Sequence, residues 1–263
     1  MQAQLSVIAT VRRSLQVLVG NLGIFLVLAV LMAVPGTVLT DGLTELFLQL
    51  NKDLLATNGV LVDKQIAAIL CMGLADIVAL PWDLVVKTLA VAAVIQVFLR
   101  ASEGKPVTMN NTFSYALSAF PRLFKPFALA QLIIFVGSLV YIPGILYGLF
   151  YAFVAPVVLL DPGVKGVLRR STRLTRGRRG RIFRIYLLFF PIWGALALLG
   201  PLMLPNMHFV IAYAAWTLNA LVWFVIVMAV LQLYVERMDQ LQSLIDQHES
   251  DDPAVDVPLK AKI

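Results

Sequence analysis

Residues Val164–Arg184 read VKGVLRRSTRLTRGRRGRIFR, a stretch with nine basic side chains and no acidic one. Long apolar runs flank it, from Pro126 to Leu160 before it and from Ile185 to Leu204 after it. A dense cationic segment between apolar runs strongly resists translocation across a membrane. We therefore expect this segment, called the basic block below, to stay on the cytoplasmic face, and the orientation of every other span follows from it.

The composition is that of a polytopic membrane protein. Of the 263 residues 60% are hydrophobic and 14% are charged, and the mean hydropathy is +0.87. Soluble domains contain about 45–50% apolar and about 25% charged residues, so the soluble globular class is excluded. The net charge is +6, but nine of the 21 basic residues lie in the basic block, where they fit the positive-inside rule. Because no nucleic-acid-binding motif accompanies them, we expect no nucleic acid partner.

The sequence carries no recognisable catalytic or metal-binding set. Cys71 is the only cysteine, which excludes an intrachain disulfide framework and a thiol metal site. Two histidines are too few for a His-rich metal cluster. No Gly-x-Ser-x-Gly elbow, Walker sequence or His-Glu-x-x-His motif occurs. We therefore expect no enzymatic activity and no cofactor.

The apolar pattern predicts an all-α membrane domain over residues 1–237, with six transmembrane helices, interfacial amphipathic helices and both termini in the cytoplasm. A partly disordered cytoplasmic tail is expected over residues 238–263. The uncharged run from Ser14 to Thr40 is much longer than a signal-peptide core of about 7–15 residues, so we expect the first span to be retained. The expected spans are residues 17–38, 80–99, 126–141, 144–160, 185–204 and 210–234.

Four segments between these spans have predicted structures. Residues 1–13 form either an interfacial helix or an extension of the first span. Asp41 to Lys64 is predicted to form an amphipathic helix on the far surface, followed by a turn at Asn58-Gly59. Pro106 to Lys125 is predicted to form an interfacial helix on the cytoplasmic side. Spans three and four are expected to make a tight hairpin that turns at Pro143-Gly144.

Residues 66–99 are ambiguous. One helix of this length would measure about 51 Å, against a hydrocarbon core of about 30 Å. Two spans would need a turn near residues 79–81, which leaves each too short. We favour one span that begins near Leu80, with residues 66–79 as a helical lead outside the membrane or at its surface, because Arg100 and Lys105 then emerge on the cytoplasmic side.

Charged and polar residues inside the predicted spans have two interpretations. Asp83 and Lys87 are four residues apart, so one helical turn brings them together. A charge within a span indicates an ion or proton path by default. Alternatively, the two neutralise each other near the outer interface. Other intramembrane polar residues are expected to form hydrogen bonds between helices: Gln96, Gln131 and Asn219.

The basic block has two predicted parts. Val164 to Thr175 forms an amphipathic helix on the inner leaflet, and Gly177 to Gly180 breaks it before span five. The block is either a topology signal alone or a surface that recognises anionic headgroups, and the two roles are compatible. The predicted headgroup contacts are Lys165, Arg169, Arg170, Arg173, Arg176, Arg178, Arg179, Arg181 and Arg184.

The order of these parts resembles the YciC family of bacterial inner-membrane proteins. The resemblance is carried by the hairpin sequence at residues 141–145, by APVVLLD at residues 155–161 and by RSTRLT at residues 170–175. The membrane domain of some glycerophosphodiester phosphodiesterases is similar in layout. The resemblance implies a six-helix protein of the bacterial inner membrane, without an established reaction or catalytic residues. This chain departs from the pattern in its heavier basic block and its acidic C-terminal tail.

Two functions are compatible with these features. The first is a non-enzymatic envelope protein that engages anionic lipids, or a membrane protein partner, through its cytoplasmic basic surface. The second is a small transporter or channel component that uses Asp83 and Lys87. No inverted repeat is visible between the two halves, and polar residues within the spans are few, which argues against the second.

Overall fold

The computed structural model describes residues 6–57, 64–140, 142–161, 163–202 and 208–251. Within these ranges the protein is all-helical, as predicted, and contains no strand. Its helices are α1 (Val7–Gly20), α2 (Leu22–Thr57), α3 (Lys64–Ser102), α4 (Met109–Ser138), α5 (Ile142–Tyr151), α6 (Val154–Leu160), α7 (Val167–Leu174), α8 (Arg179–Leu202) and α9 (His208–Asp251).

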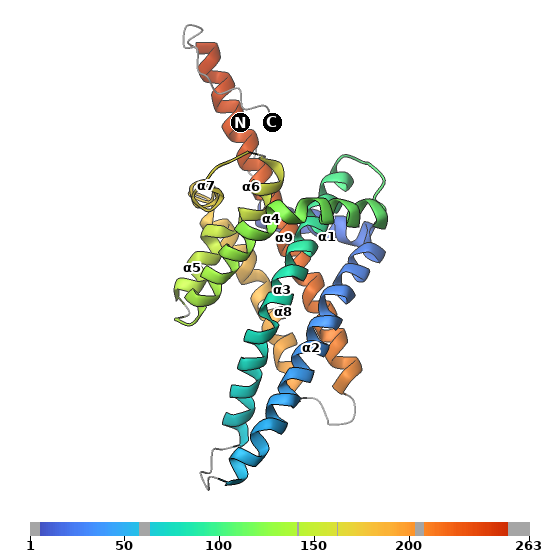
Figure 1. The fold of residues 1–263 in the computed structure, drawn as a ribbon. Helices are drawn as coiled ribbons and strands as arrows, with labels where there is room; N and C mark the ends of the chain where they lie inside the picture. The colour runs from blue at the N-terminus through green and yellow to red at the C-terminus, as the bar shows by residue number, and fades with distance from the viewer. Residues whose placement is uncertain (1–5, 58–63, 141, 162, 203–207, 252–263) are drawn as a thin grey trace.

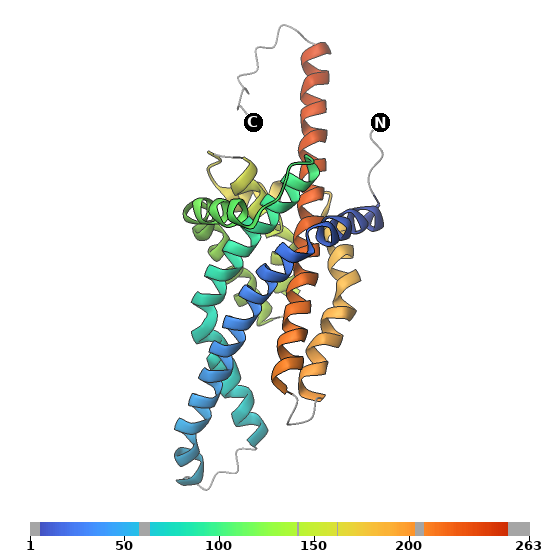
Figure 2. The same cartoon turned by 90° about the vertical axis from the view of Figure 1, so that its right-hand side faces the viewer.

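The long helices α2, α3, α8 and α9 run along one bundle axis, and the shorter helices gather at one end of it (Figure 1). Figure 2 shows α1 and the first half of α4 lying across that axis at the same level. The last turns of α9 stand clear of the bundle beyond this level (Figure 2). We call this end, which carries α1, α7 and the α3–α4 connection, the basic end.

Four helices of the described residues are long and apolar enough to cross a membrane, and the total is five if the bent pair of α1 and α2 counts as one span. The four are Ile77–Ser102, Met109–Ser138, Ile142–Leu160 and Tyr213–Ser243. These apolar helices are those of a membrane protein. The predicted span 185–204 belongs to α8, but its last two residues lie outside the described ranges.

The predicted first span over residues 17–38 contains a break. α1 ends at Gly20 and α2 begins at Leu22, and the two helix axes are bent by 91°. Asn21 leaves the helical conformation at this break, with φ of −127°. Because α1 buries one face against α9, it runs across the bundle and does not extend the span. The described residues 7–20 are therefore not a straight extension of α2.

The helix predicted within Asp41 to Lys64 is not separate from the first span, because α2 continues through Pro35 to Thr57 without a break. The predicted turn at Asn58-Gly59 lies outside the described residues. The next helix, α3, packs beside α2 and runs without interruption from Lys64 to Ser102. This confirms that no turn divides residues 66–99. The far ends of α2 and α3 project together beyond the ends of α8 and α9 (Figure 2).

The α4–α5 hairpin differs from the prediction in its turn. α4 runs through Pro121 and Pro126 to Ser138, and α5 already begins at Ile142. Pro143-Gly144 therefore lies in the first turn of α5, where a missing N–H costs least. A Cβ on Gly144 would meet the Ser138 backbone at 2.6–2.7 Å, so only glycine permits this close approach. From Pro126 to its end α4 is about 20 Å long. The α4–α5 hairpin therefore extends less far from the basic end, along the bundle axis, than α2, α3, α8 and α9 do (Figure 1).

The predicted fourth span, residues 144–160, consists of α5 and α6 with an interruption at residues 152–153. The last predicted span, residues 210–234, lies within α9, which continues as one helix to Asp251. At about 66 Å, α9 is twice as long as the hydrocarbon core requires. The polar residues 248–251 of the predicted tail are therefore helical, and residues 252–263 lie outside the described ranges.

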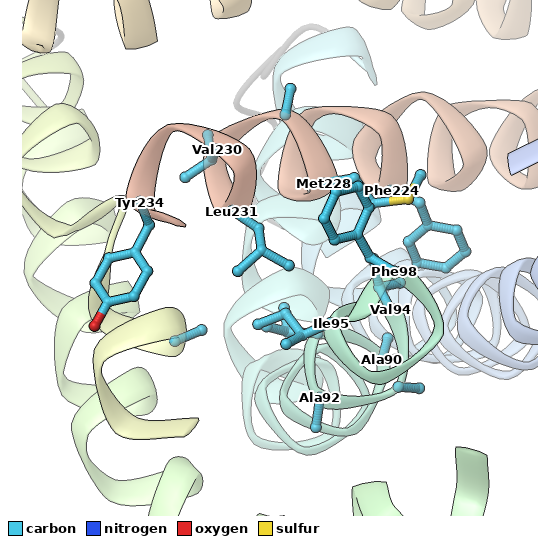
Figure 3. Packing of buried hydrophobic residues seen from close by; sticks show 14 of the residues in the cluster. Ala90, Ala92, Val94, Ile95, Phe98, Phe224, Met228, Val230, Leu231 and Tyr234 are labelled. Carbon is cyan, nitrogen blue, oxygen red and sulfur yellow. The ribbon is translucent and has the colours of Figure 1, made fainter. Parts of the chain in front are cut away.

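The core lies where α3 and α9 cross. Val94, Ile95 and Phe98 of α3 are buried there together with Phe224, Met228 and Leu231 of α9 (Figure 3). Phe224 of α9 contacts Phe25 of α2 with ring centroids 5.9 Å apart. The core therefore ties three of the long helices to one another and fixes the position of the basic end.

Candidate functional site

The basic block forms a short helix, a turn and the start of a long helix. Gly166 precedes α7 in the left-handed conformation, with φ of +75°. The turn after α7 contains Gly177 with φ of +84°, and α8 begins at Arg179. Both glycines allow backbone that other residues rarely adopt. The predicted break at Gly177 is therefore confirmed, whereas Gly180 lies inside α8.

Arg178 turns inward. Its side chain is 6% exposed, and Nη1 lies 3.0 Å from Oε2 of Glu236 on α9. Its Nη2 donates a 2.6 Å hydrogen bond to Oε1 of Gln240, one turn further along α9. Arg181 donates to Oε1 of the same Glu236 at 3.1 Å. Two arginines of the basic block therefore clamp the start of α8 onto α9.

Two further arginines of the basic block bind neighbouring helices. The guanidinium of Arg179 lies over the ring of Phe150 in α5, 4.2 Å from its centroid, and Nη2 donates to the Thr172 carbonyl at 3.2 Å. Arg170 forms an ion pair with Asp161, the residue that follows α6. We call Arg170, Arg178, Arg179 and Arg181 the paired arginines.

The remaining five basic side chains of the block face away from the protein. All five residues are exposed, and within the described part of the chain none forms an ion pair. Arg184 donates only to the Gly180 carbonyl of its own helix, at 3.2 Å. We call these residues the outward cations: Lys165, Arg169, Arg173, Arg176 and Arg184.

The apolar face of the amphipathic helix predicted over Val164 to Thr175 packs largely against protein. Ser171 and Leu174 of α7 are buried, and α7 packs against α4, α5 and α6. The Ser171 hydroxyl donates a 2.9 Å hydrogen bond to the Phe150 carbonyl of α5. Because these contacts fix the rotation of α7 about its axis, they determine that Arg169 and Arg173 are directed outward, while Arg176 is exposed in the turn that follows.

More exposed cations lie at the basic end. Arg12 and Arg13 are exposed on α1, and Arg122 and Lys125 are exposed on α4. Acidic residues at this end are already engaged by a cation in three cases: Glu103 with Lys105, Asp161 with Arg170, and Glu236 with Arg178 and Arg181. The exposed surface of the basic end therefore carries a net positive charge and attracts anions.

The predicted Asp83–Lys87 contact is present, with Lys87 Nζ 2.6 Å from Asp83 Oδ2. The two side chains are 43% and 33% exposed, respectively. Asp83 lies about 26 Å along α3 from Arg100, close to the full thickness of a hydrocarbon core. The neighbouring Trp82 is 43% exposed, as expected for an aromatic residue at a membrane surface. The two charges therefore neutralise each other six to ten residues into the candidate span Ile77–Ser102.

The three other predicted polar residues are half-buried: Gln96 in α3, Gln131 in α4 and Asn219 in α9. A buried polar contact that was not predicted joins α1 to α9. The Gln232 amide Nε2 donates to the Ser14 hydroxyl at 2.8 Å and to the Thr10 carbonyl at 3.2 Å. No sequence signal pointed to this contact, because its partners are more than 200 residues apart in the chain.

Compared with known protein families, curated proteins and solved structures, the chain matches none of them. The resemblance to the YciC family therefore stays a prediction. No group of three or more potential metal ligands occurs among the described residues.

Proposed function

We propose that this protein is a non-enzymatic bacterial inner-membrane protein of the cell envelope, and that its cytoplasmic basic surface engages anionic lipids. The division of the basic block carries the proposal. Four arginines serve the fold, yet five cations remain exposed beside them without a protein partner in the described residues. Contacts within the protein explain the presence of the four paired arginines but not that of the five outward cations. Each cation near an anionic membrane surface contributes about 1 kcal/mol of attraction, which suffices to enrich anionic headgroups around the basic end.

The proposed topology has six passes, through α2, α3, α4, the α5–α6 pair, α8 and α9, with both termini in the cytoplasm. α1 and the first half of α4 would lie in the headgroup layer, since both cross the bundle axis at the basic end (Figure 2). The α4–α5 hairpin enters from the basic end and returns to it. The parity of the remaining helices is therefore the same whether or not the hairpin fully crosses the membrane. The proposed kinship with YciC-like proteins rests on residues 141–185.

The lipid proposal is tested by removing three outward cations together, as Arg169→Gln, Arg173→Gln and Arg176→Gln. The protein is reconstituted in nanodiscs of phosphatidylglycerol and phosphatidylcholine, released into mild detergent and analysed by native mass spectrometry. We expect the wild type to retain phosphatidylglycerol preferentially and the triple variant to lose most of that preference, because three cations of about 1 kcal/mol each are removed. A control with lysine at the same three positions keeps the charge and should behave as the wild type.

Equal enrichment of phosphatidylglycerol in the wild type and the glutamine variant would refute the lipid proposal. If the variant instead loses a co-purifying membrane protein while lipid retention is unchanged, the outward cations bind a protein partner. Melting temperatures of the variants report whether the fold is intact.

Orientation is tested separately with single cysteines on a Cys71→Ser background. Ser243→Cys is at an exposed position of α9, eight residues before that helix ends, and Glu45→Cys is at an exposed position of α2, twelve residues before that helix ends. In intact spheroplasts, a membrane-impermeant maleimide should label the cysteine at residue 45 and spare the one at residue 243. The reverse pattern would place the basic block outside the cell and contradict the positive-inside assignment.

A further inference from the structure

A small hollow of about 190 Å³ opens at the basic end where α4, α6 and α7 meet. Its walls are apolar, formed by Val158 near the end of α6, by Val164 before α7 and by Val167 at the start of α7. Two charged side chains, Arg122 of α4 and Asp161 after α6, also line it. A hollow of this volume suits a small polar headgroup and is too small for a whole lipid.

Arg122 provides a cation for an anionic ligand. It is exposed, and its guanidinium forms no ion pair with any other described residue. A guanidinium offers a planar fork of donors that matches two oxygens of a phosphate group. Arg122 is therefore available to a ligand in the hollow, unlike the paired arginines.

Asp161 gives the hollow a second, opposite chemistry. Its side chain is 21% exposed and forms an ion pair with Arg170 of α7. Asp161 nevertheless still lines the hollow. With Arg122, Arg170 and Asp161 the local charge is +1, so an anion is favoured overall. A carboxylate accepts hydrogen bonds only, and it therefore favours a ligand that carries a donor beside its phosphate.

The buried hydroxyl of Tyr234 is a further polar group near Asp161. Tyr234 of α9 is 2% exposed, packs edge-on against Phe153 with ring centroids 5.5 Å apart, and lies within electrostatic range of Asp161 and Arg170. Its hydroxyl has no hydrogen-bond partner among the described residues. Figure 3 shows this oxygen at the edge of the core, directed away from the α3 side chains. The polar groups around Asp161 thus still have hydrogen-bonding capacity.

We propose that this hollow holds the headgroup of one phospholipid, with its phosphate on Arg122 and a hydroxyl or ammonium donor on Asp161. The apolar walls favour a lipid over a free phosphate ester, because Val158, Val164 and Val167 contact the glycerol region and exclude water from it. The assignment rests on the proposed lipid function and adds a discrete, selective site to a diffuse charged surface. Phosphatidylethanolamine and phosphatidylglycerol carry the required donor, whereas the quaternary ammonium of phosphatidylcholine carries none.

The test measures binding of short-chain dioctanoyl lipids to the full-length protein in detergent by native mass spectrometry. Arg122→Gln should weaken binding of the ethanolamine and glycerol lipids about tenfold, since it removes a charge-assisted pair of hydrogen bonds. Lys125→Gln is the matched control, because it removes one exposed charge from the same helix three residues away and does not line the hollow. We expect less than about a twofold change in the control, which loses only a screened surface charge.

Selectivity is tested through Asp161→Asn, which should reduce the preference for the ethanolamine and glycerol lipids over the choline lipid to near zero. Because this change also releases Arg170, the variant Arg170→Gln serves as its control: it breaks the same ion pair but keeps the carboxylate, and it should keep the preference. Melting curves of both variants identify any general loss of fold.

Equal losses in Arg122→Gln and Lys125→Gln would overturn the discrete site and leave only the diffuse surface. Unchanged binding in Arg122→Gln, with lipid preference still lost in the triple variant of the outward cations, would overturn the site and retain the proposed function. If neither Arg122→Gln nor the triple variant of the outward cations loses lipid, both the discrete site and the proposed lipid function are overturned. Competition by free phosphoethanolamine as strong as by the lipid would assign the hollow to a soluble phosphate ester and overturn the lipid source.

Discussion

The two groups of cations in the basic block differ in their surroundings, although they are drawn from the same 21-residue stretch. Arg178 is buried against Glu236 and Gln240, while Arg176, two residues earlier, is exposed. Both groups consist of basic side chains, so the difference in burial comes from the packing of α7 and α8 against their neighbours. A run of arginines that orients a membrane protein can therefore also build its fold, and only the remainder is free to bind a ligand.

The sharpest separation between the two groups is expected from Arg178→Gln and Arg169→Gln. Removing Arg178 leaves Glu236, which is 14% exposed, with Arg181 as its remaining partner, so the loss should stay below the cost of about 3–5 kcal/mol for a buried charge left without any partner. The exposed Arg169 should change stability by less than about 0.5 kcal/mol. Thermal unfolding in detergent measures both. Similar melting temperatures for the two variants would mean that Arg178 is no more structural than Arg169.

The turn that separates α7 from α8 is the next test. Gly177 has a φ of +84° with open space around its Cα, so Gly177→Ala meets no steric contact but pays about 1–2 kcal/mol for a left-handed backbone. Gly180 also has open space but lies inside α8, so Gly180→Ala should be neutral or stabilise the protein by about 0.5–1 kcal/mol. Opposite signs in thermal unfolding are expected. Destabilisation by both substitutions would indicate crowding instead of backbone conformation.

A smaller effect is expected at Arg179, which is half-buried over Phe150. Arg179→Gln removes a cation–π contact of about 0.5–1 kcal/mol. Phe150→Leu should cost a similar amount in addition to its lost packing, and the double variant should cost less than the sum of the two single variants. A double-mutant cycle measures this coupling. Additive effects would place Arg179 among the outward cations.

The smallest effect is expected for the ion pair at the opposite end of the bundle. If Asp83 and Lys87 lie at the interface, Asp83→Asn should cost less than about 1 kcal/mol, because exposed pairs contribute little. An unpaired Lys87 deep in hydrocarbon would instead cost about 2.5–3.5 kcal/mol. Unfolding in detergent and insertion efficiency measure the difference. A large loss for the single variant that Asp83→Asn with Lys87→Gln restores would revive the ion-path hypothesis.

Sequence patterns predicted those features that depend on local spacing. The helical class, the single helix through residues 66–99, the break at Gly177 and the Asp83–Lys87 contact all depend on residues within a few turns of one another. The errors occurred where distant packing decides a boundary. α1 turns at Asn21 because its face is buried on α9, and α2 continues past Pro35 beside α3. Neither partner can be inferred from the local pattern.

By itself, the sequence determined that this is an apolar helical protein with its positive charge concentrated in one block, because hydropathy and charge are summed along the chain. Only the tertiary structure decided which cations remain for a ligand. Glu236 engages Arg178 from 58 positions away, and Asp161 meets Arg170 across the turn between α6 and α7. Whether a charge is paired depends on which side chain lies a few ångströms from it, and that distance is set by how the helices pack.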